Sequence, residues 1–276
     1  MYKIMQFILI LAIYSSVFAK DSLVFAPLPM EDTKTIFTQF DPMVKFLEKK
    51  LKKKIILDYN QNYADILKKF QENKIDLAYL GPLPYIKLKE KYILATPLVH
   101  FKSRNGNAFY TCSLISTSNT NIEIKDIKNK KIALTQPLST CGYLSVNTLL
   151  KKEKSLLENN KYQYLGRHDS VALSVIRREF DFGGVKSSIA KKYTNLGLKE
   201  LAKTPLLPSF SLIGNKATIQ SDTLNQIIKI MKNIKKEETQ YWGENIKYGC
   251  IEAKNSDFNN LRMLYYNTSI PNKGNF

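Results

Sequence analysis

The sequence predicts a two-lobe α/β protein. Short apolar runs alternate with amphipathic stretches, and strands separated by helices are typical of βαβ units with a parallel sheet. This series occurs twice, and the extended segments 108–116 and 209–213 separate the two series. We therefore expect two lobes, each a mostly parallel sheet flanked by helices, joined by two extended crossovers. The expected lobes are 20–107 plus 210–276, and 108–209.

The first series begins with a buried strand at 23–28 that ends in a turn. Asp41 and Pro42 then predict a helix start, because Asp is a favoured N-cap and Pro fits the first helical position. On this helix one face carries the apolar residues Met43, Phe46, Leu47 and Leu51. The next predicted elements are a strand at 54–58, a helix at 64–70, a strand at 75–80 that Gly81-Pro82 breaks, and a helix from near Pro84.

The second series follows the long strand expected at 108–116. Its predicted elements are a strand at 131–134, a helix at 141–151, a strand at 162–165, a helix at 169–178, a strand at 180–184, another helix, and a strand at 198–203. The extended segment 209–213 then precedes three helical stretches. The ligand of such a fold is expected in the cleft between the lobes, at the carboxyl ends of the strands.

Charge points to an anionic partner without identifying it. The 276 residues include 42 Lys and Arg against 24 Asp and Glu, a formal charge of +18. Such a balance suggests nucleic acid, anionic lipid or an anionic ligand. Nearly all of the cations are Lys, as a codon bias would produce, whereas phosphate-reading surfaces favour Arg. Hydrophobic residues make up 44 % and charged residues 24 % of the chain, which excludes a disordered tail and a multi-pass membrane protein.

The N-terminus predicts export. Lys3 is followed by an apolar run at 4–14 and by small residues that end at Ala19, the pattern of a cleaved signal peptide. The alternative is an anchor that stays attached. No Cys stands at the cleavage point, so a lipoprotein is disfavoured. A mature chain that starts near Lys20 and leaves the cytoplasm is not expected to bind nucleic acid.

Cysteine and histidine usage indicates neither a metal nor a cofactor. The three cysteines, Cys112, Cys141 and Cys250, allow one disulfide plus a free thiol, or three free thiols. No C-x-x-C spacing occurs, and His100 and His168 are the two histidines. We therefore expect no metal site and no cofactor.

Three strand-to-helix turns carry the candidate chemistry. In the first, at 136–143, Ser139 and Thr140 precede a predicted helix, whose unpaired N–H groups and positive dipole end attract anions. Gly142 would allow an anion to approach the backbone closely. The alternative is that the hydroxyls only cap the helix. The second turn carries His168, and the third is the Gly-Pro break after the strand at 75–80.

In order, these turns resemble one family. The succession of D-x-A-x-x-G-P, S-T-x-G-Y, G-x-H-D and x-D-x-G is similar to that of the phosphonate, phosphite and phosphate-binding proteins of ABC importers. The segments 125–133 and 248–251 resemble further family motifs. The resemblance covers nearly the whole mature chain. It implies the type II periplasmic-binding fold, a periplasmic location and a small oxyanion as ligand. It also implies that the protein is a monomer and that its partner is an ABC permease in the inner membrane.

The resemblance also implies ligand-binding residues. Its oxyanion cradle corresponds to Ser139, Thr140, the amides of Cys141 and Gly142, Tyr143, and a donor from His168. The first lobe would contribute Tyr79, Tyr85 or the backbone at 27–29. Positions that are acidic in relatives that bind aminoethylphosphonate fall near Ser188 and Phe210, neither of them acidic. This favours phosphate, phosphite or a small alkylphosphonate.

Two other functions remain open from the sequence. The protein could present its ligand to a histidine kinase as a sensor, with Cys141 contacting a thiophilic oxyanion such as arsenite. It could also be an exported enzyme that uses Cys141 as nucleophile and His168 as base. We expect a binding protein rather than an enzyme, because the sequence offers no group to orient His168.

Overall fold

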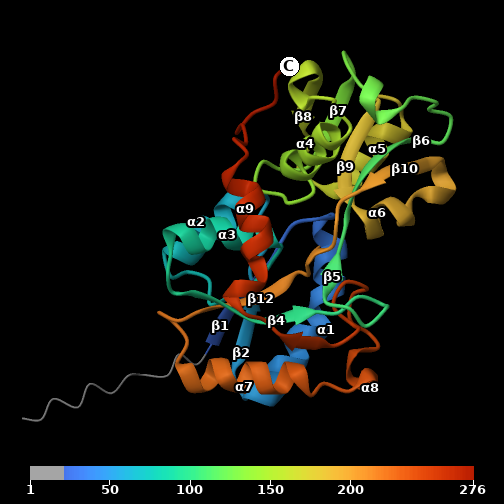
Figure 1. The fold of residues 1–276 in the computed structure, drawn as a ribbon. Helices are drawn as coiled ribbons and strands as arrows, with labels where there is room; N and C mark the ends of the chain where they lie inside the picture. The colour runs from blue at the N-terminus through green and yellow to red at the C-terminus, as the bar shows by residue number, and fades with distance from the viewer. Residues whose placement is uncertain (1–21) are drawn as a thin grey trace, which may run out of the picture.

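A computed structural model describes residues 22–276; the predicted signal peptide at 1–19 lies outside the described residues. Figure 1 shows two α/β lobes. One contains the blue beginning and much of the orange and red end of the chain, and the other contains its green to gold middle. The predicted two-lobe α/β architecture is confirmed. No helix of residues 22–276 is long and apolar enough to cross a membrane.

The first sheet has six strands, drawn from both ends of the chain. Its order is β13 (Cys250–Glu252), β4 (Ala95–Phe101), β12 (Ser211–Asn215), β3 (Leu77–Leu80), β1 (Ser22–Pro27) and β2 (Lys54–Leu57). Strand β1 runs parallel to β2 and β3, with Leu23 opposite Ile55 and Phe25 opposite Leu77. Strand β12 is antiparallel to both β3 and β4. A strand returning from the other lobe is therefore inserted into the middle of this sheet.

The second sheet follows the same plan. Its order is β10 (Leu198–Lys203), β6 (Cys112–Thr117), β9 (Phe182–Lys186), β7 (Lys131–Leu134) and β8 (Lys161–Tyr164). Strand β7 is parallel to β8 and β9, while β6 is antiparallel to β9 and β10. Here too, a crossover strand lies between the parallel part and the last strand.

The chain crosses between the lobes twice, and the two crossing segments lie side by side. Strand β5 (Phe109–Tyr110) pairs antiparallel with β11 (Leu207–Pro208), forming a two-residue ribbon between the sheets. The sequence predicted one long strand over 108–116, whereas the structure divides it at Thr111. Residues 109–110 pair with the returning crossover, and β6 pairs inside the second sheet. The prediction of a single strand was therefore wrong, because β5 and β6 belong to different sheets.

Helix α1 (Thr33–Leu51) begins earlier than predicted. Its N-cap is Asp32, whose carboxylate accepts hydrogen bonds from the Thr35 amide at 3.0 Å and hydroxyl at 2.6 Å. Pro42 lies inside the helix, so the prediction of a start at Asp41 was wrong. The buried side chains of Ile36 and Phe40 extend the apolar stripe toward the N-terminus, and their packing holds the first turns helical despite Pro42.

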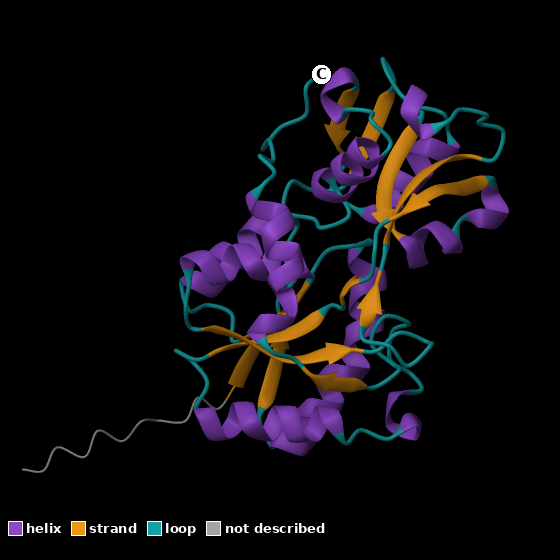
Figure 2. Ribbon diagram, in the orientation of Figure 1, coloured by secondary structure: helices purple, strands orange, loops and turns teal. Residues whose placement is uncertain are grey.

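The other helices cover the faces of the sheets, as Figure 2 shows. In the first lobe α1 and α7 pack together on one face, and α2, α3 and α9 pack together on the other. The helices of this lobe besides α1 are α2 (Tyr63–Gln71), α3 (Pro82–Lys91), α7 (Ser221–Lys232), α8 (Lys236–Thr239) and α9 (Asn259–Tyr266). The second sheet is covered by α4 (Tyr143–Lys152), α5 (His168–Ile176) and α6 (Ser187–Lys192). Single 3-10 turns occur at Ile124–Asp126, Leu157–Asn159, Thr194–Leu196 and Asn255–Phe258.

Each lobe buries its own apolar core. A large cluster in the first lobe includes Phe25, Phe40 and Tyr79 and extends to Phe210 at the crossover. In the second lobe one cluster lies beneath α4 and another beneath α5 and α6. Burial of apolar surface on both faces explains why the strands read as continuous apolar runs. The two cores hold the cleft edges of the sheets in fixed positions.

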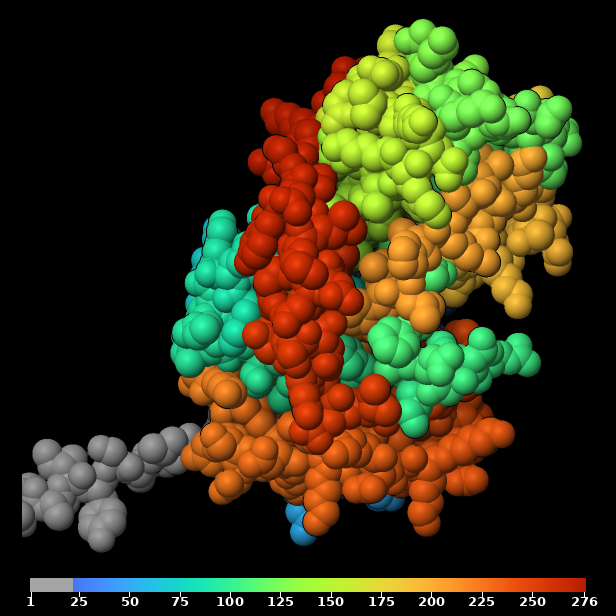
Figure 3. Space-filling view, in the orientation of Figure 1, coloured from blue at the N-terminus to red at the C-terminus, as the bar shows by residue number. Residues whose placement is uncertain are grey.

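The last residues of the chain cross back to the second lobe. Figure 3 shows the red C-terminal segment running along one face from the lower lobe to the upper one. The Asn275 amide donates to the Tyr162 carbonyl at 3.0 Å, and the Tyr162 amide donates to the Asn275 side chain at 2.7 Å. The Tyr164 hydroxyl donates to the Pro271 carbonyl at 2.8 Å. The two lobes are therefore linked by a third segment besides the crossovers.

Candidate functional site

A small cavity lies between the lobes where their strands end. Its volume is about 10 Å³, roughly the space of one water molecule. Residues of both lobes and of the crossovers line it: Leu28, Tyr63, Gly81, Pro84, Tyr110, Ser139, Thr140, Cys141, His168 and Phe210. A phosphonate needs more space, so the lobes must open or the aromatic side chains must shift when such a ligand enters.

Four helices begin at this cavity. Tyr63 is the first residue of α2, Gly81 is the N-cap of α3, residues 139–142 lead into α4, and His168 is the first residue of α5. The start of a helix carries unpaired N–H donors and about half a positive charge. The cavity lining contains no Lys, Arg, Asp or Glu. Oriented backbone dipoles and neutral donors therefore favour an anion here.

Hydrogen bonds within residues 136–145 fix the shape of the 139–142 loop, which lies against β9 at Gly184. The Ser139 amide donates to the Gln136 carbonyl at 2.9 Å, and the Gly142 amide donates to the Ser139 carbonyl at 3.1 Å. Ser145 in α4 donates its hydroxyl hydrogen to the Thr140 carbonyl at 2.5 Å. A Cβ atom on Gly184 would lie only 2.6 Å from the Cys141 carbonyl oxygen. Glycine at 184 thus sets how closely this loop approaches the sheet.

We expect Gly184→Ala to weaken ligand binding as well as stability. The added methyl group would meet Val146 at 2.4 Å and the Cys141 backbone at 2.6 Å, so the loop must move. The free energy of unfolding should fall by about 1–3 kcal/mol. The matched control is Gly183→Ala, whose methyl group would meet Val171 on the opposite face at 2.7 Å. Calorimetric titration should show lower affinity in the first variant alone; equal affinities would contradict this role of Gly184.

Two buried hydroxyl groups supply donors to the cavity. Thr140 Oγ1 accepts a hydrogen bond from the Leu83 amide of the first lobe at 3.0 Å, which leaves its own hydrogen to donate. The Tyr110 hydroxyl lies buried near Thr140 and has no partner of hydrogen-bonding geometry among the described residues. Tyr63 of the first lobe lines the same cavity as Ser139. An oxyanion in the cavity would be within reach of donors from both lobes.

His168 is fixed as a neutral donor. The ring is 1 % exposed, and its Nδ1 accepts a hydrogen bond from the Lys186 amide at 3.1 Å. Because Nδ1 accepts, the ring hydrogen is assigned to Nε2. Burial is the main cause, and the Lys186 charge the lesser one, that together lower the pKa of His168 from 6.5 to about 3. Over the ordinary pH range His168 therefore offers one N–H donor and no charge.

Because His168 is buried in its neutral form, we expect the free energy of unfolding to fall as the pH is lowered. Below pH 6.5 the unfolded chain binds a proton at His168 that the folded chain does not, until pH approaches 3. Between pH 7 and pH 5 this single group should lower the free energy of unfolding by about 2 kcal/mol. Urea unfolding at both pH values checks this against His168→Asn, which should lose less stability over the same interval. An equal loss in the two proteins would contradict the assignment.

Cys141 carries no thiol. Its sulfur is bonded to that of Cys112 at the start of β6, with 5.0 Å between the two Cα atoms. The roles considered for a Cys141 thiol, as a nucleophile or as a contact to arsenite, are therefore wrong. Cys250 is the free cysteine and is buried. The disulfide fixes the 139–142 loop to the crossover strand.

The structure brings together only some of the predicted site residues. Ser139, Thr140, Cys141, His168 and Phe210 line the cavity, as does Leu28 from the predicted 27–29 backbone. The other predicted residues do not line it. Gly142 lies behind the loop as the N-cap of α4, and Tyr143 points its hydroxyl to Glu158 at 3.0 Å.

Tyr79 and Tyr85 also lie away from the cavity lining. Tyr79 stacks behind Phe210, with 5.1 Å between the ring centroids. Tyr85 packs on Phe258 and donates its hydroxyl hydrogen to Asn255 at 2.8 Å. Both are core residues of the first lobe, and their positions on either side of the Gly-Pro break did not distinguish a core residue from a ligand-binding one.

Sequence reasoning missed Tyr63, Tyr110 and Lys186. Tyr63 follows the helix cap Asn62, whose side chain accepts from the Asp65 amide at 2.9 Å; an Asn before a periodic apolar stretch is the signal that could have located this helix start. Tyr110 belongs to the two-residue ribbon. Lys186 ends β9 and becomes important only because the tertiary structure buries it.

Several polar contacts connect the lobes around the cavity. The Tyr63 amide donates to Gln136 Oε1 at 2.8 Å, and the His168 amide donates to the Met30 carbonyl at 3.0 Å. Lys192 of α6 forms an ion pair with Glu31 at 2.5 Å. The described arrangement is therefore a closed one, with both lobes in direct contact around the cavity.

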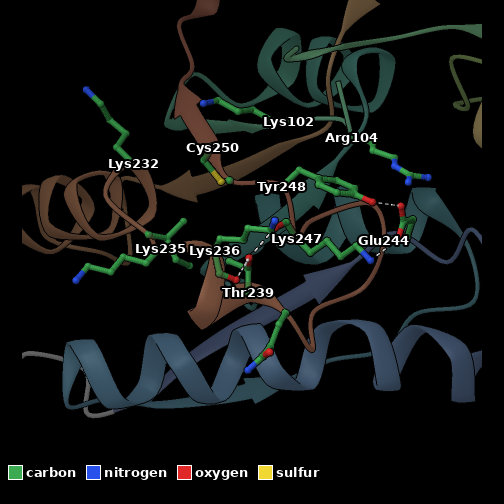
Figure 4. Close-up of a pocket in the computed structure, with 13 residues that line it drawn as sticks. Lys102, Arg104, Lys232, Lys235, Lys236, Thr239, Glu244, Lys247, Tyr248 and Cys250 are labelled. Carbon is green, nitrogen blue, oxygen red and sulfur yellow. Dashed lines mark hydrogen bonds and ion pairs between the residues drawn. The ribbon is translucent and has the colours of Figure 1, made fainter. Parts of the chain in front are cut away.

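Two larger hollows lie outside the cavity. One, of about 760 Å³, opens between the lobes beside Tyr110 and Lys186. The other, of about 750 Å³, lies on the first lobe near α7, α8 and Cys250. In Figure 4 its lysines Lys232 and Lys235 extend away from Lys247 and Glu244 rather than toward one point. Residues 22–276 contain no group of His, Cys, Asp and Glu that could hold a metal ion.

Fold and site together define a class of protein, the two-lobe solute-binding protein with a small cavity, free of charged side chains, between its lobes. The chain belongs to the family described as the periplasmic phosphonate substrate-binding protein of ABC transporters, whose family model matches residues 25–258. Members of this family bind a substrate for an importer and are not enzymes. The resemblance recognised in the sequence is thereby confirmed.

Curated relatives and solved structures agree with this family. The chain is 26 % identical over 174 residues, 59 % of its length, to the phosphate-import protein PhnD of Mycolicibacterium smegmatis. It is 23 % identical over 223 residues, 76 % of its length, to the phosphonates-binding periplasmic protein of Escherichia coli. These matches span 54 % and 65 % of the two relatives.

The fold is similar to that of PhnD1 from Prochlorococcus marinus in complex with methylphosphonate. The TM-score is 0.80 at 15 % identity, and the match covers 90 % of this chain and 98 % of that one. A binding protein of an ABC phosphonate transporter from Pseudomonas aeruginosa gives a TM-score of 0.78 at 16 % identity, covering 89 % of this chain and 86 % of that one. These likenesses show the shared type II periplasmic-binding fold.

Proposed function

We propose that this protein binds a tetrahedral phosphorus oxyanion in the periplasm and delivers it, as a monomer, to the permease of an ABC importer. The ligand class comprises phosphate, phosphite and small phosphonates. The observation that supports it best is the convergence of four helix starts on one cavity without a charged side chain in its lining. Family membership supports the importer role.

In this proposal the oxyanion bridges the lobes. The Thr140 hydroxyl and the amides of Thr140 and Cys141 would donate from the second lobe, together with the Nε2–H group of His168 and the hydroxyl of Tyr110. The positive dipole ends of α2 and α3 would complete the site from the first lobe, because the Tyr63 and Leu83 amides already have partners. The lobes, 20–107 plus 210–276 and 108–209, would open and close about the crossover ribbon of β5 and β11. The permease would then recognise the closed form.

Calorimetric titration of protein dialysed free of phosphate tests this function. Methylphosphonate, phosphite and phosphate should be compared with sulfate, because all four are small tetrahedral oxyanions. We expect at least one phosphorus oxyanion to bind and sulfate to bind more weakly. Failure of all three phosphorus compounds to bind, or equally tight sulfate binding, would overturn the proposal.

A sensor that presents the same ligand to a histidine kinase would use the same closed clamp. The specific arsenite contact considered for it is lost, because the sulfur of Cys141 is held in the disulfide with Cys112. We therefore propose the importer role, and a permease complex reconstituted with and without ligand would distinguish it from the sensor.

A further inference from the structure

Lys186 is a buried cation beside the oxyanion cavity. It ends β9, its amide donates to His168 Nδ1, and the residue is only 7 % exposed. Its ammonium group lies 4.5 Å from the centroid of the Phe210 ring and 5.5 Å from that of Tyr110. Both rings line the oxyanion cavity. The Tyr110 and Phe210 rings thus adjoin the oxyanion cavity on one side and the Lys186 ammonium group on another.

No carboxylate neutralises this ammonium group. Within residues 22–276 Lys186 forms no ion pair, and its Nζ donates instead to the neutral Asn245 side chain at 2.8 Å. Glu31 is the acidic residue whose charge acts on it. The Glu31 carboxylate is already held by Lys192 at 2.5 Å and by Gln39 at 2.8 Å. Apart from the charge of Glu31, which forms no ion pair with it, the Lys186 ammonium group is therefore compensated by an amide oxygen and two aromatic rings.

Burying a cation without an ion-pair partner lowers the stability of the folded protein, because the charge loses its hydration. Burial lowers the pKa of Lys186 from 10.5 to about 8, so the side chain is still mostly charged at pH 7. A methionine would fill the same space without the desolvation penalty. Retention of a charge at this position is explained if a bound molecule supplies the missing anion.

The space next to Lys186 can hold part of a ligand. The hollow of about 760 Å³ between the lobes is lined by Lys186 and by Tyr110, which also lines the oxyanion cavity. In Figure 3 the surface between the lobes is notched on the side where the green 102–109 segment faces the gold residues near α6. The ionisable side chains lining this hollow include six cations and two acids: Lys102, Arg104, Lys186, Lys191, Lys192 and Lys203, with Glu200 and Glu244. A substituent on the oxyanion that passes Tyr110 would enter a positively charged space.

We propose that the ligand carries a second anionic group, a carboxylate or a further phosphoryl group, which Lys186 and Asn245 bind on the far side of Tyr110 and Phe210. This inference rests on the proposed function and narrows its ligand class to small phosphonates or phosphoryl compounds with a negatively charged substituent. Lys186 is then a specificity-determining residue. It replaces, at the substituent end of the site, the acidic groups that an amino-bearing ligand would require.

Calorimetric titration with two probes tests the inference. Methylphosphonate carries the oxyanion alone, and phosphonoacetate carries the same oxyanion with a carboxylate. We expect the native protein to bind phosphonoacetate at least about tenfold more tightly, the effect of one charge-assisted hydrogen bond. In Lys186→Met this preference should disappear, while the affinity for methylphosphonate stays within about threefold of native. Lys186→Glu should instead favour 2-aminoethylphosphonate.

The control variant is Lys191→Met, an exposed lysine of the same hollow. It should keep the native preference for phosphonoacetate, because its charge is solvated. Thermal melting confirms that each variant folds, and Lys186→Met should melt at a higher temperature than the native protein.

Equal affinity of the native protein for both probes would overturn the inference about the second anionic group and leave the proposed function standing. An equal weakening of both probes in Lys186→Met would also overturn it, because Lys186 would then neutralise the phosphonate itself. Binding of neither probe, nor of phosphite or phosphate, would overturn the proposed function as well.

Discussion

Replacing His168 with asparagine should lower the affinity for methylphosphonate by about 10- to 150-fold. Asparagine can still accept the hydrogen bond that the Lys186 amide gives to Nδ1, but it does not place a donor where Nε2 lies. A hydrogen bond to a charged group contributes about 1.5–3 kcal/mol, which corresponds to this loss of affinity. The measurement is calorimetric titration at pH 7, where the depressed pKa of His168 keeps the native ring neutral.

Glutamine at the same position is the matched control. Its longer side chain carries an N–H donor near the position of Nε2, so His168→Gln should recover part of the affinity that His168→Asn loses. Thermal melting of both variants separates binding from stability. If His168→Asn folds and binds methylphosphonate within threefold of the native protein, His168 is not a ligand donor.

Loss of the disulfide should destabilise the protein by about 3–4 kcal/mol. Cys112 and Cys141 are 29 residues apart in sequence, and closing a loop of this length restricts the unfolded chain by about that much. The double variant Cys112→Ala/Cys141→Ala should therefore unfold at a lower urea concentration. Because the bond also fixes the 139–142 loop, we expect weaker methylphosphonate binding in the same variant.

Reductant supplies an internal control for this prediction. Dithiothreitol should lower the stability of the native protein and leave that of the double variant unchanged. Thiol titration of the native protein should find no reactive group when folded and one when unfolded, because burial of Cys250 raises the pKa of its thiol. Two or more reactive thiols in the unreduced, unfolded chain would show that Cys112 and Cys141 are not bonded.

The regular elements were predicted best where the apolar pattern was simple. Helices α2, α4 and α5 and strands β1, β2, β7 and β8 lie within a few residues of their predicted positions. Strand β4 was missed, and it contains Pro97, a residue that normally argues against a central strand. The irregular register between β4 and β12 occurs where Pro97 lies opposite Ile213. A local pattern could not show that the sheet tolerates a proline at this point.

Helix α1 shows that a local sequence signal can also predict a helix start that the structure does not have. Asp41 and Pro42 form a good local start signal, yet the helix begins at Thr33 and is capped by Asp32. Local capping preferences contribute about 1 kcal/mol. Burial of the Phe40 side chain, whose ring lies 4.9 Å from that of Tyr79, contributes more than that. Tertiary packing therefore decided where the helix begins.

By itself, the sequence determined the class of this protein, a two-lobe α/β fold and a family. It also predicted an anion cradle at Ser139 and Thr140 with His168 nearby, and these three residues line one cavity. These features are local, because a strand-to-helix turn carries its donors wherever it lies. The tertiary structure decided which residues from distant segments share the cavity. It placed Tyr63 and Tyr110 in the lining, moved Tyr79 and Tyr85 into the core, and bonded Cys141 to Cys112. It also buried Lys186 without a carboxylate partner, since burial and charge pairing depend on contacts between residues far apart in the chain.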